Sequence, residues 1–233
     1  MMADWSRTAE RLMLSAIDSK IRVLALTGPF PGAGVTTVAR GLAAAFTRAG
    51  RKTLLIDLSR TPDGEESASG WIPGEALAAT AIVTGDDGVA TLAGSVSAAG
   101  RARFSNVERV RRALEQDLAS YEQIILDLAA VDGKASDGLN PLAAARAADA
   151  VILVALTGLT YRAELTASAQ ALRQVGANVT GVVLNDQFCA TLGEEIADVA
   201  YSRLGRWFPR TAERIARRAL SIPYLAQGFR IVR

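Results

Sequence analysis

The sequence contains no histidine and one cysteine, Cys189. Without histidine, the chain cannot use an imidazole as a general acid or base, and most zinc sites are excluded. One cysteine cannot form an intrachain disulfide, which fits a reducing compartment. Cys189 follows a predicted strand and has no histidine to activate it, so we do not expect it to act as a nucleophile.

Long apolar runs are also missing from the sequence. No run approaches the roughly 18 residues that a membrane-spanning helix needs. Residues 1–20 lack the apolar core of a secretion signal. We therefore expect a cytoplasmic protein.

The charge is nearly balanced overall but uneven along the chain. The net charge of +2 does not by itself favour a nucleic-acid partner. Between Tyr201 and Arg233, however, the chain has arginines throughout and a single acid, Glu213. Because the basic residues are confined to this one element, with no base-reading surface, we expect no nucleic-acid binding.

Arg203–Arg218 predicts an amphipathic basic helix, for which two interpretations remain open. Such a helix can make a peripheral contact with an anionic membrane or an acidic partner. Alternatively, its apolar side, with Trp207 and Phe208, faces the core while the arginines face water.

Alternating strands and helices predict an α/β fold with a doubly wound, mainly parallel sheet flanked by helices. Expected strands cover residues 22–26, 52–58, 123–128, 150–156 and 179–184, with a weaker candidate at 89–92. Expected helices cover 5–19, 36–48, 107–120, 141–148, 162–175 and 192–220, the last interrupted near Gly205 and Pro209. A short helix is also favoured over Glu75–Thr84. We expect a single domain over residues 1–233, in which residues 201–233 form a basic C-terminal helix and tail.

The first strand leads into a loop rich in glycine and proline, and the loop opens a helix. This is the layout of a P-loop, in which backbone N–H groups at a helix N-terminus hold phosphate. The expected nucleotide-binding residues of the loop are Gly32, Ala33, Gly34, Val35, Thr36 and Thr37. The P-loop motif has lysine after its last glycine, and here Val35 occupies that position.

Two apolar strands end in aspartate, at Asp57 and Asp127. In open α/β sheets, ligands bind at the carboxyl ends of the strands, so both acids are expected beside the loop. P-loop NTPases hold Mg²⁺ and align the attacking group with such acids. ATP with Mg²⁺ is therefore the expected cofactor, with Thr36 and Asp57 as metal ligands and Asp127 in the site. The alternative is that each acid only satisfies the turn after its strand.

Together these motifs resemble the MinD/ParA-like P-loop superfamily. Within it, the chain is most similar to the cytoplasmic domain of bacterial tyrosine kinases that partner polysaccharide chain-length regulators. The motifs are Pro31-Gly32-x-Gly34-x-Thr36, Leu55-Ile56-Asp57, Ile124-Ile125-Leu126-Asp127, Ala148-Asp149-Ala150-Val151 and Gly181-Val182-Val183-Leu184-Asn185. The resemblance implies a MinD/ParA-type P-loop fold, a membrane-embedded polysaccharide co-polymerase as partner, homo-oligomerisation, and a place at the inner face of the cell membrane.

Several positions depart from the pattern of that family. They are Ala33, Val35 and Ser59 in the nucleotide motifs, Thr8 and Leu14 in the oligomerisation helix, and Tyr201 and Tyr224 in place of a tyrosine cluster. Losing one preorganised stabiliser of developing charge typically lowers a rate by on the order of 10²–10³. The sequence therefore predicts a catalytically degenerate, tyrosine-kinase-like protein that regulates polymerisation or export of an exopolysaccharide or capsule.

Two other functions fit the same resemblance. The chain can be an active ATPase or autophosphorylating tyrosine kinase in which Arg60 or Lys134 replaces the lysine. It can also be a MinD-like positioning protein that docks on the membrane through its arginine-rich helix. Separately, Trp71 and Pro73 form either a partner-facing patch or a cap on the sheet edge.

Overall fold

The computed structural model describes residues 2–59, 70–75, 81–132, 139–186, 192–204 and 208–222. Its contacts divide the chain into two compact units. The first contains Met1–Ala155 and Thr160–Asn185, and the second contains Leu156–Leu159 and Asp186–Arg233. The last helices, which the sequence analysis places in a single domain with the rest of the chain, belong to the second of these units. Arg60, Lys134, Cys189, Trp207 and residues 223–233 lie outside the described residues.

The first unit is built on a sheet of seven described strands in the order β3-β4-β2-β5-β1-β6-β7. The strands are β1 (Val23–Thr27), β2 (Thr53–Leu58), β3 (Ile82–Thr84), β4 (Ala90–Ala93), β5 (Gln123–Leu128), β6 (Ala150–Leu156) and β7 (Val179–Asn185). β1 pairs in parallel with both β5 and β6, β2 pairs in parallel with β4 and β5, and β3 is antiparallel to β4. The predicted α/β fold with a mainly parallel sheet is confirmed.

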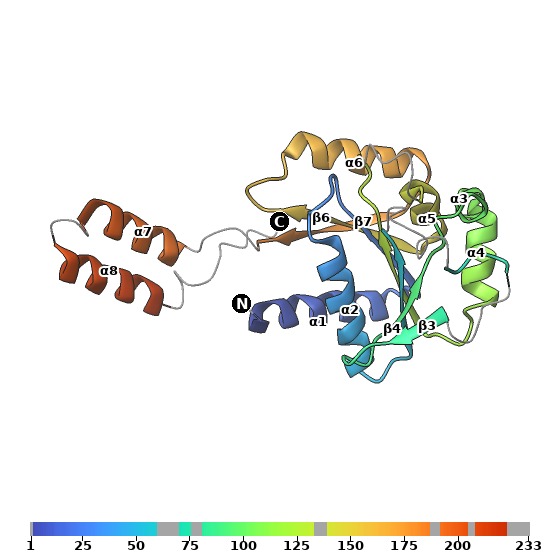
Figure 1. Cartoon of the computed structure of the whole chain (residues 1–233), viewed down its shortest axis with the longest axis horizontal. Helices are drawn as coiled ribbons and strands as arrows, with labels where there is room; N and C mark the ends of the chain where they lie inside the picture. The colour runs from blue at the N-terminus through green and yellow to red at the C-terminus, as the bar shows by residue number, and fades with distance from the viewer. Residues whose placement is uncertain are drawn as a thin grey trace. The chain divides into compact units, whose positions relative to one another are not determined.

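Helices cover both faces of this sheet (Figure 1). In the first unit they are α1 (Met2–Asp18), α2 (Val35–Arg48), α3 (Ala98–Phe104), α4 (Val107–Gln116), α5 (Pro141–Ala147) and α6 (Arg162–Gln174). The helices α1 and α2 pack on one face, and α3 to α6 pack on the other. β1, β5 and β6 are buried on both faces, as their nearly continuous apolar sequences predict.

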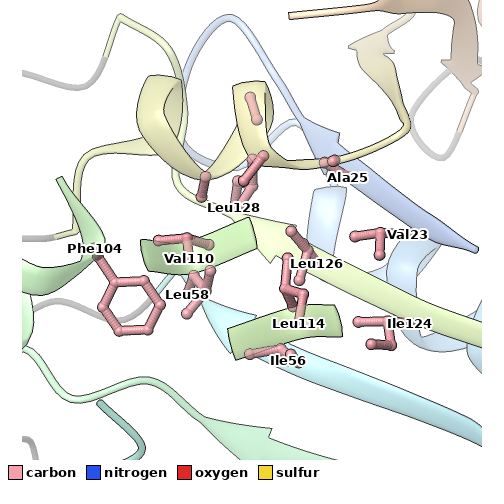
Figure 2. Packing of buried hydrophobic residues seen from close by; sticks show 14 of the residues in the cluster. Val23, Ala25, Ile56, Leu58, Phe104, Val110, Leu114, Ile124, Leu126 and Leu128 are labelled. Carbon is pink, nitrogen blue, oxygen red and sulfur yellow. The ribbon is translucent and has the colours of Figure 1, made fainter. Parts of the chain in front are cut away.

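Figure 2 shows the core between α4 and the neighbouring strands β2 and β5. Val110 and Leu114 lie one helical turn apart and therefore share one face of α4. Both are buried against strand residues such as Ile56 and Leu126. Alternate residues of β2 and β5 point to this face. They pack against α4 while the two strands pair with each other.

The segment before α4 differs from the prediction. Ile82–Thr84 forms β3, where the sequence favoured the end of a short helix over Glu75–Thr84. Pairing with β4 along Ile82↔Leu92 to Thr84↔Ala90 overrides the weak local preference. Helix α3 was not predicted, because residues 86–104 are rich in small residues and show no clear helical period of apolar side chains. Ser97 caps it by accepting a hydrogen bond from the N–H of Gly100.

Trp71 is 3 % exposed and packs edge-on against Phe104, with ring centroids 5.7 Å apart. It also forms an isolated parallel bridge with Gly94, directly after β4. Trp71 therefore caps the sheet edge, and the interpretation of Trp71 as a partner-facing side chain is wrong.

The second unit contains α7 (Leu192–Leu204) and α8 (Pro209–Ser221), which pack against each other. The buried residues of α8 are all alanines, Ala212, Ala216 and Ala219. Phe208 is 62 % exposed and Leu220 is 48 % exposed.

Within the described part of the chain, no helix combines the length and the apolar character needed to cross a membrane.

Candidate functional site

The loop between β1 and α2 has the backbone of an anion cradle. Gly32 and Gly34 have φ angles of 91° and 88°, a left-handed conformation that favours glycine. Gly34 is the N-cap of α2 and, as a glycine, has no side chain that could cap the N–H groups of the first turn. A helix N-terminus with free N–H groups attracts negative charge. The loop thus keeps the backbone features of phosphate binding.

Val35 occupies the position of the lysine, and its side chain packs inward. It contacts the apolar cluster under α2. Its Cγ2 lies 3.1 Å from where a Cβ on Gly28 would stand, so the two ends of the loop approach closely at this point. The loop therefore has no cation at its own lysine position, as the sequence indicates.

Asp57 and Asp127 are directly opposite each other across the β2–β5 pair. Parallel strands end at the same edge of the sheet, and this edge faces the N-terminus of α2. Asp57 is half-buried, and its Oδ1 accepts hydrogen bonds from Ser59 N at 3.1 Å and Ser59 Oγ at 2.8 Å. The structure thus brings the two predicted acids together.

Asp127 is 1 % exposed, and its Oδ1 has no hydrogen-bond partner among the described residues. The pKa of the Asp127 carboxyl group is raised to about 7, mainly by burial and to a smaller extent by the charge of Asp57. The side chain of Thr36, the charge of Arg40 and the side chain of Ser59 act in the opposite direction. Asp127 therefore holds its proton far more strongly than an exposed aspartate does.

Thr36 connects the loop to these acids, because its side chain interacts with Asp127. Thr37 is exposed beside it, while Ala33 is fully buried. The predicted loop residues therefore include the exposed hydroxyl groups of Thr36 and Thr37 at the start of α2, and the apolar side chains of Ala33 and Val35, which pack inward. The two threonines are the ones that can contact a ligand with a polar side chain.

Asn185, the last residue of β7, is a site residue that the sequence analysis did not select. Its Nδ2 donates a hydrogen bond to the carbonyl oxygen of Ala33 at 3.0 Å. A Cβ on Gly34 would overlap with the same Nδ2 atom. The available signal was a polar residue at the carboxyl end of a strand, the same signal that identified Asp57 and Asp127.

Arg40 was also not selected. It lies one helical turn after Thr36 on α2, is exposed, and its charge lowers the pKa of Asp127. The two cations that the sequence analysis did select, Arg60 and Lys134, lie outside the described residues.

The donor set suits Mg²⁺ as it is bound by phosphate-handling proteins. Mg²⁺ prefers oxygen ligands and often takes one or two carboxylates together with phosphate oxygens and water. Asp57, Asp127 and the hydroxyl of Thr36 offer such oxygens at one edge, and the unpaired Oδ1 of Asp127 is a buried acceptor there. The described residues contain no cluster of three or more His, Cys, Asp or Glu that could bind a metal by itself. These residues would thus hold Mg²⁺ only together with a phosphate ligand, whose charge the ion offsets when bound.

Solved structures with the same arrangement of elements include two bacterial tyrosine kinase domains. The kinase domain of the Escherichia coli tyrosine kinase ETK is 26 % identical over 75 % of this chain and 71 % of that chain, with a TM-score of 0.61. The VpsO kinase domain is 24 % identical over 77 % of this chain and 92 % of that chain, with a TM-score of 0.63. The chain shares the fold of these kinase domains.

A third solved structure is more distant. It is the septum site-determining protein MinD from Pyrococcus horikoshii in complex with Mg-ADP, which is 19 % identical over 83 % of this chain and 76 % of that chain. Its TM-score is 0.52. No protein-family model matches the chain, and neither does any curated protein sequence. These similarities support the resemblance to MinD-like P-loop proteins at the level of the fold.

Proposed function

We propose that this protein is a tyrosine-kinase-like P-loop protein that has lost efficient phosphoryl transfer. It regulates the polymerisation or export of an exopolysaccharide or capsule through a membrane-embedded co-polymerase. The observation that carries the proposal is Val35, which packs into the apolar cluster where the motif has a lysine. The nearby backbone cradle and the acids are retained. This combination favours a site that keeps its shape and lacks its catalytic charge.

Ser59 adds a second loss beside Asp57. The related motif has a carboxylate at this position, and here a hydroxyl donates to Asp57 Oδ1 instead. Transfer of a phosphoryl group depends almost entirely on positioned charges around the phosphates. Two charges missing from one site therefore lower the expected rate more than either alone.

The polysaccharide role comes from the similarity to the kinase domains of ETK and VpsO, and the partner would be met at the inner face of the membrane. The predicted self-association is part of the same proposal. Leu14, at one position of the oligomerisation pattern, is exposed on α1, where an apolar side chain can serve a protein contact.

We expect the full-length protein to hydrolyse no ATP above background in the presence of Mg²⁺. We also expect no phosphate on Tyr201, Tyr224 or a co-purified partner after incubation with ATP, as mass spectrometry would determine. An active bacterial tyrosine kinase domain, assayed in parallel, is the positive control. Turnover that disappears in Asp57→Ala would contradict the proposed loss. It would favour the alternative of an active kinase with a relocated cation, such as Arg60 or Lys134.

A second candidate function, peripheral membrane contact, is favoured by α8. Arg210, Arg214 and Arg217 are exposed on the same helix as the exposed side chains Ile215 and Leu220. Mixed basic and apolar exposure is typical of helices that lie in the interface of an anionic membrane.

We expect the full chain to float with vesicles that contain anionic lipid and to remain behind with neutral vesicles. Charge reversal of the four exposed arginines of α8, Arg210, Arg214, Arg217 and Arg218, to glutamate should abolish flotation, because each basic residue near an anionic surface contributes about 1 kcal/mol. Reversal of four exposed arginines of the first unit, Arg48, Arg112, Arg162 and Arg173, is the matched control. Equal flotation of both variants would exclude α8 as the contact.

A further inference from the structure

We propose that Arg40 is the cationic group of this site and that it holds the terminal phosphates of a polyphosphate anion over the N-terminus of α2. This inference rests on the proposed function, because it assigns a ligand class to the same loop. It concerns binding alone and includes no phosphoryl transfer. In this chain the positive charge lies one helical turn after the loop, whereas the P-loop motif has it in the loop itself.

The helix geometry places Arg40 within reach of the cradle. Residues four apart lie on the same face of an α-helix, so Arg40 and Thr36 share a face. Four residues rise only about 6 Å along the axis. Because Cα–Cβ bonds in a helix tilt toward its N-terminus, a long side chain covers the turn that precedes it. An arginine at this position can therefore reach the level of Thr36 and Thr37.

Arg40 is available for a ligand. It is exposed, and within the described part of the chain it makes no ion pair at contact distance; the ion pairs there involve Arg103, Arg111 and Arg217. Its charge lowers the pKa of Asp127, and it shares a helix face with Thr36, whose side chain interacts with the same carboxyl group. A guanidinium also offers several N–H donors in a planar fork, which suits phosphate oxygens.

The unpaired Oδ1 of Asp127 points independently to a ligand. It belongs to a side chain that is 1 % exposed, and Thr36 interacts with the same carboxyl group. A buried oxygen without a partner costs free energy. The Mg²⁺ that accompanies a polyphosphate would bring a cation to this edge and remove that cost. The N-terminus of α2 and Arg40 suit the phosphates, and this oxygen suits the accompanying cation.

Calorimetric titration of the full chain with inorganic tripolyphosphate and with ATP tests the proposal, each with Mg²⁺ and with EDTA. Tripolyphosphate isolates the phosphate contacts, and ATP shows what the base adds. Arg40→Ala should weaken tripolyphosphate binding about tenfold or more, because a hydrogen bond to a charged group contributes about 1.5–3 kcal/mol. Arg40→Lys should keep most of the affinity, since it keeps the charge.

Arg48→Ala is the matched control, because Arg48 is an exposed arginine two turns further along α2. It should bind like the wild type, and circular dichroism should show that all three variants fold. Equal affinity of Arg40→Ala and wild type, or the absence of binding to the wild type, would overturn the inference. Either result leaves the proposed loss of phosphoryl transfer intact, whereas ATP turnover would overturn that loss and leave the role of Arg40 standing.

Discussion

Replacement of Asp127 with asparagine should stabilise the folded protein at pH 8 and leave its stability almost unchanged near pH 4. The carboxyl group has a pKa of about 7 in the folded chain and 3.8 in the unfolded chain. The folded state therefore binds the proton more tightly, and stability falls as the pH rises from about 4 to about 7. A difference of this size corresponds to about 4 kcal/mol at most.

Asparagine removes this dependence because it carries no charge at any pH. Urea unfolding between pH 4 and pH 8, in buffer with EDTA, would measure the difference. Asp86→Asn is the matched control, since Asp86 is an exposed acid in a turn before β4. If Asp127→Asn is no more stable than wild type at pH 8, burial does not penalise this carboxylate as the structure implies.

Replacement of Val35 with lysine should raise the affinity for ATP with Mg²⁺ at least tenfold. Lysine restores a positive charge beside the terminal phosphates, where the P-loop motif has one, and a charge-assisted contact contributes about 1.5–3 kcal/mol. The apolar stem of lysine can keep part of the packing that Val35 makes under α2. Titration with a fluorescent ATP analogue would measure the gain.

Val35→Gln separates charge from size, because glutamine is long and polar but neutral. It should bind ATP no better than wild type. Turnover should remain low even in Val35→Lys, since Ser59 still occupies the position of the second carboxylate. Equal affinity of the lysine and glutamine variants would mean that the missing charge is not what limits binding.

Most of the strands, and the edge of the sheet at which the two acids lie, could be predicted from the sequence alone. Apolar runs buried on both faces marked β1, β5 and β6, and parallel strands must end at one edge. That condition predicts Asp57 and Asp127 at the loop edge of the sheet, whereas their direct pairing depends on the order of the strands.

The remaining features depend on contacts that no local pattern records. β3 exists because β4 lies beside it, and its three residues carry little signal. Arg40 was missed because its relevance lies in the face of α2 that it shares with Thr36. Asn185 was missed because its target, the carbonyl of Ala33, is far away in the chain. The division into two units depends on which elements pack against each other in space, and the composition of the sequence does not show this.

Gly34 has a consequence for how such sequences are classified. Its backbone φ of 88° requires glycine, and a Cβ there would also displace the Nδ2 of Asn185 from its present position. Neither requirement involves a bound nucleotide. A chain that gives up phosphate chemistry can therefore exchange the lysine freely while the glycine stays, because the architecture itself demands it. The glycines of this motif therefore indicate the backbone shape of the loop, and the residue that follows them indicates whether the loop carries a catalytic charge.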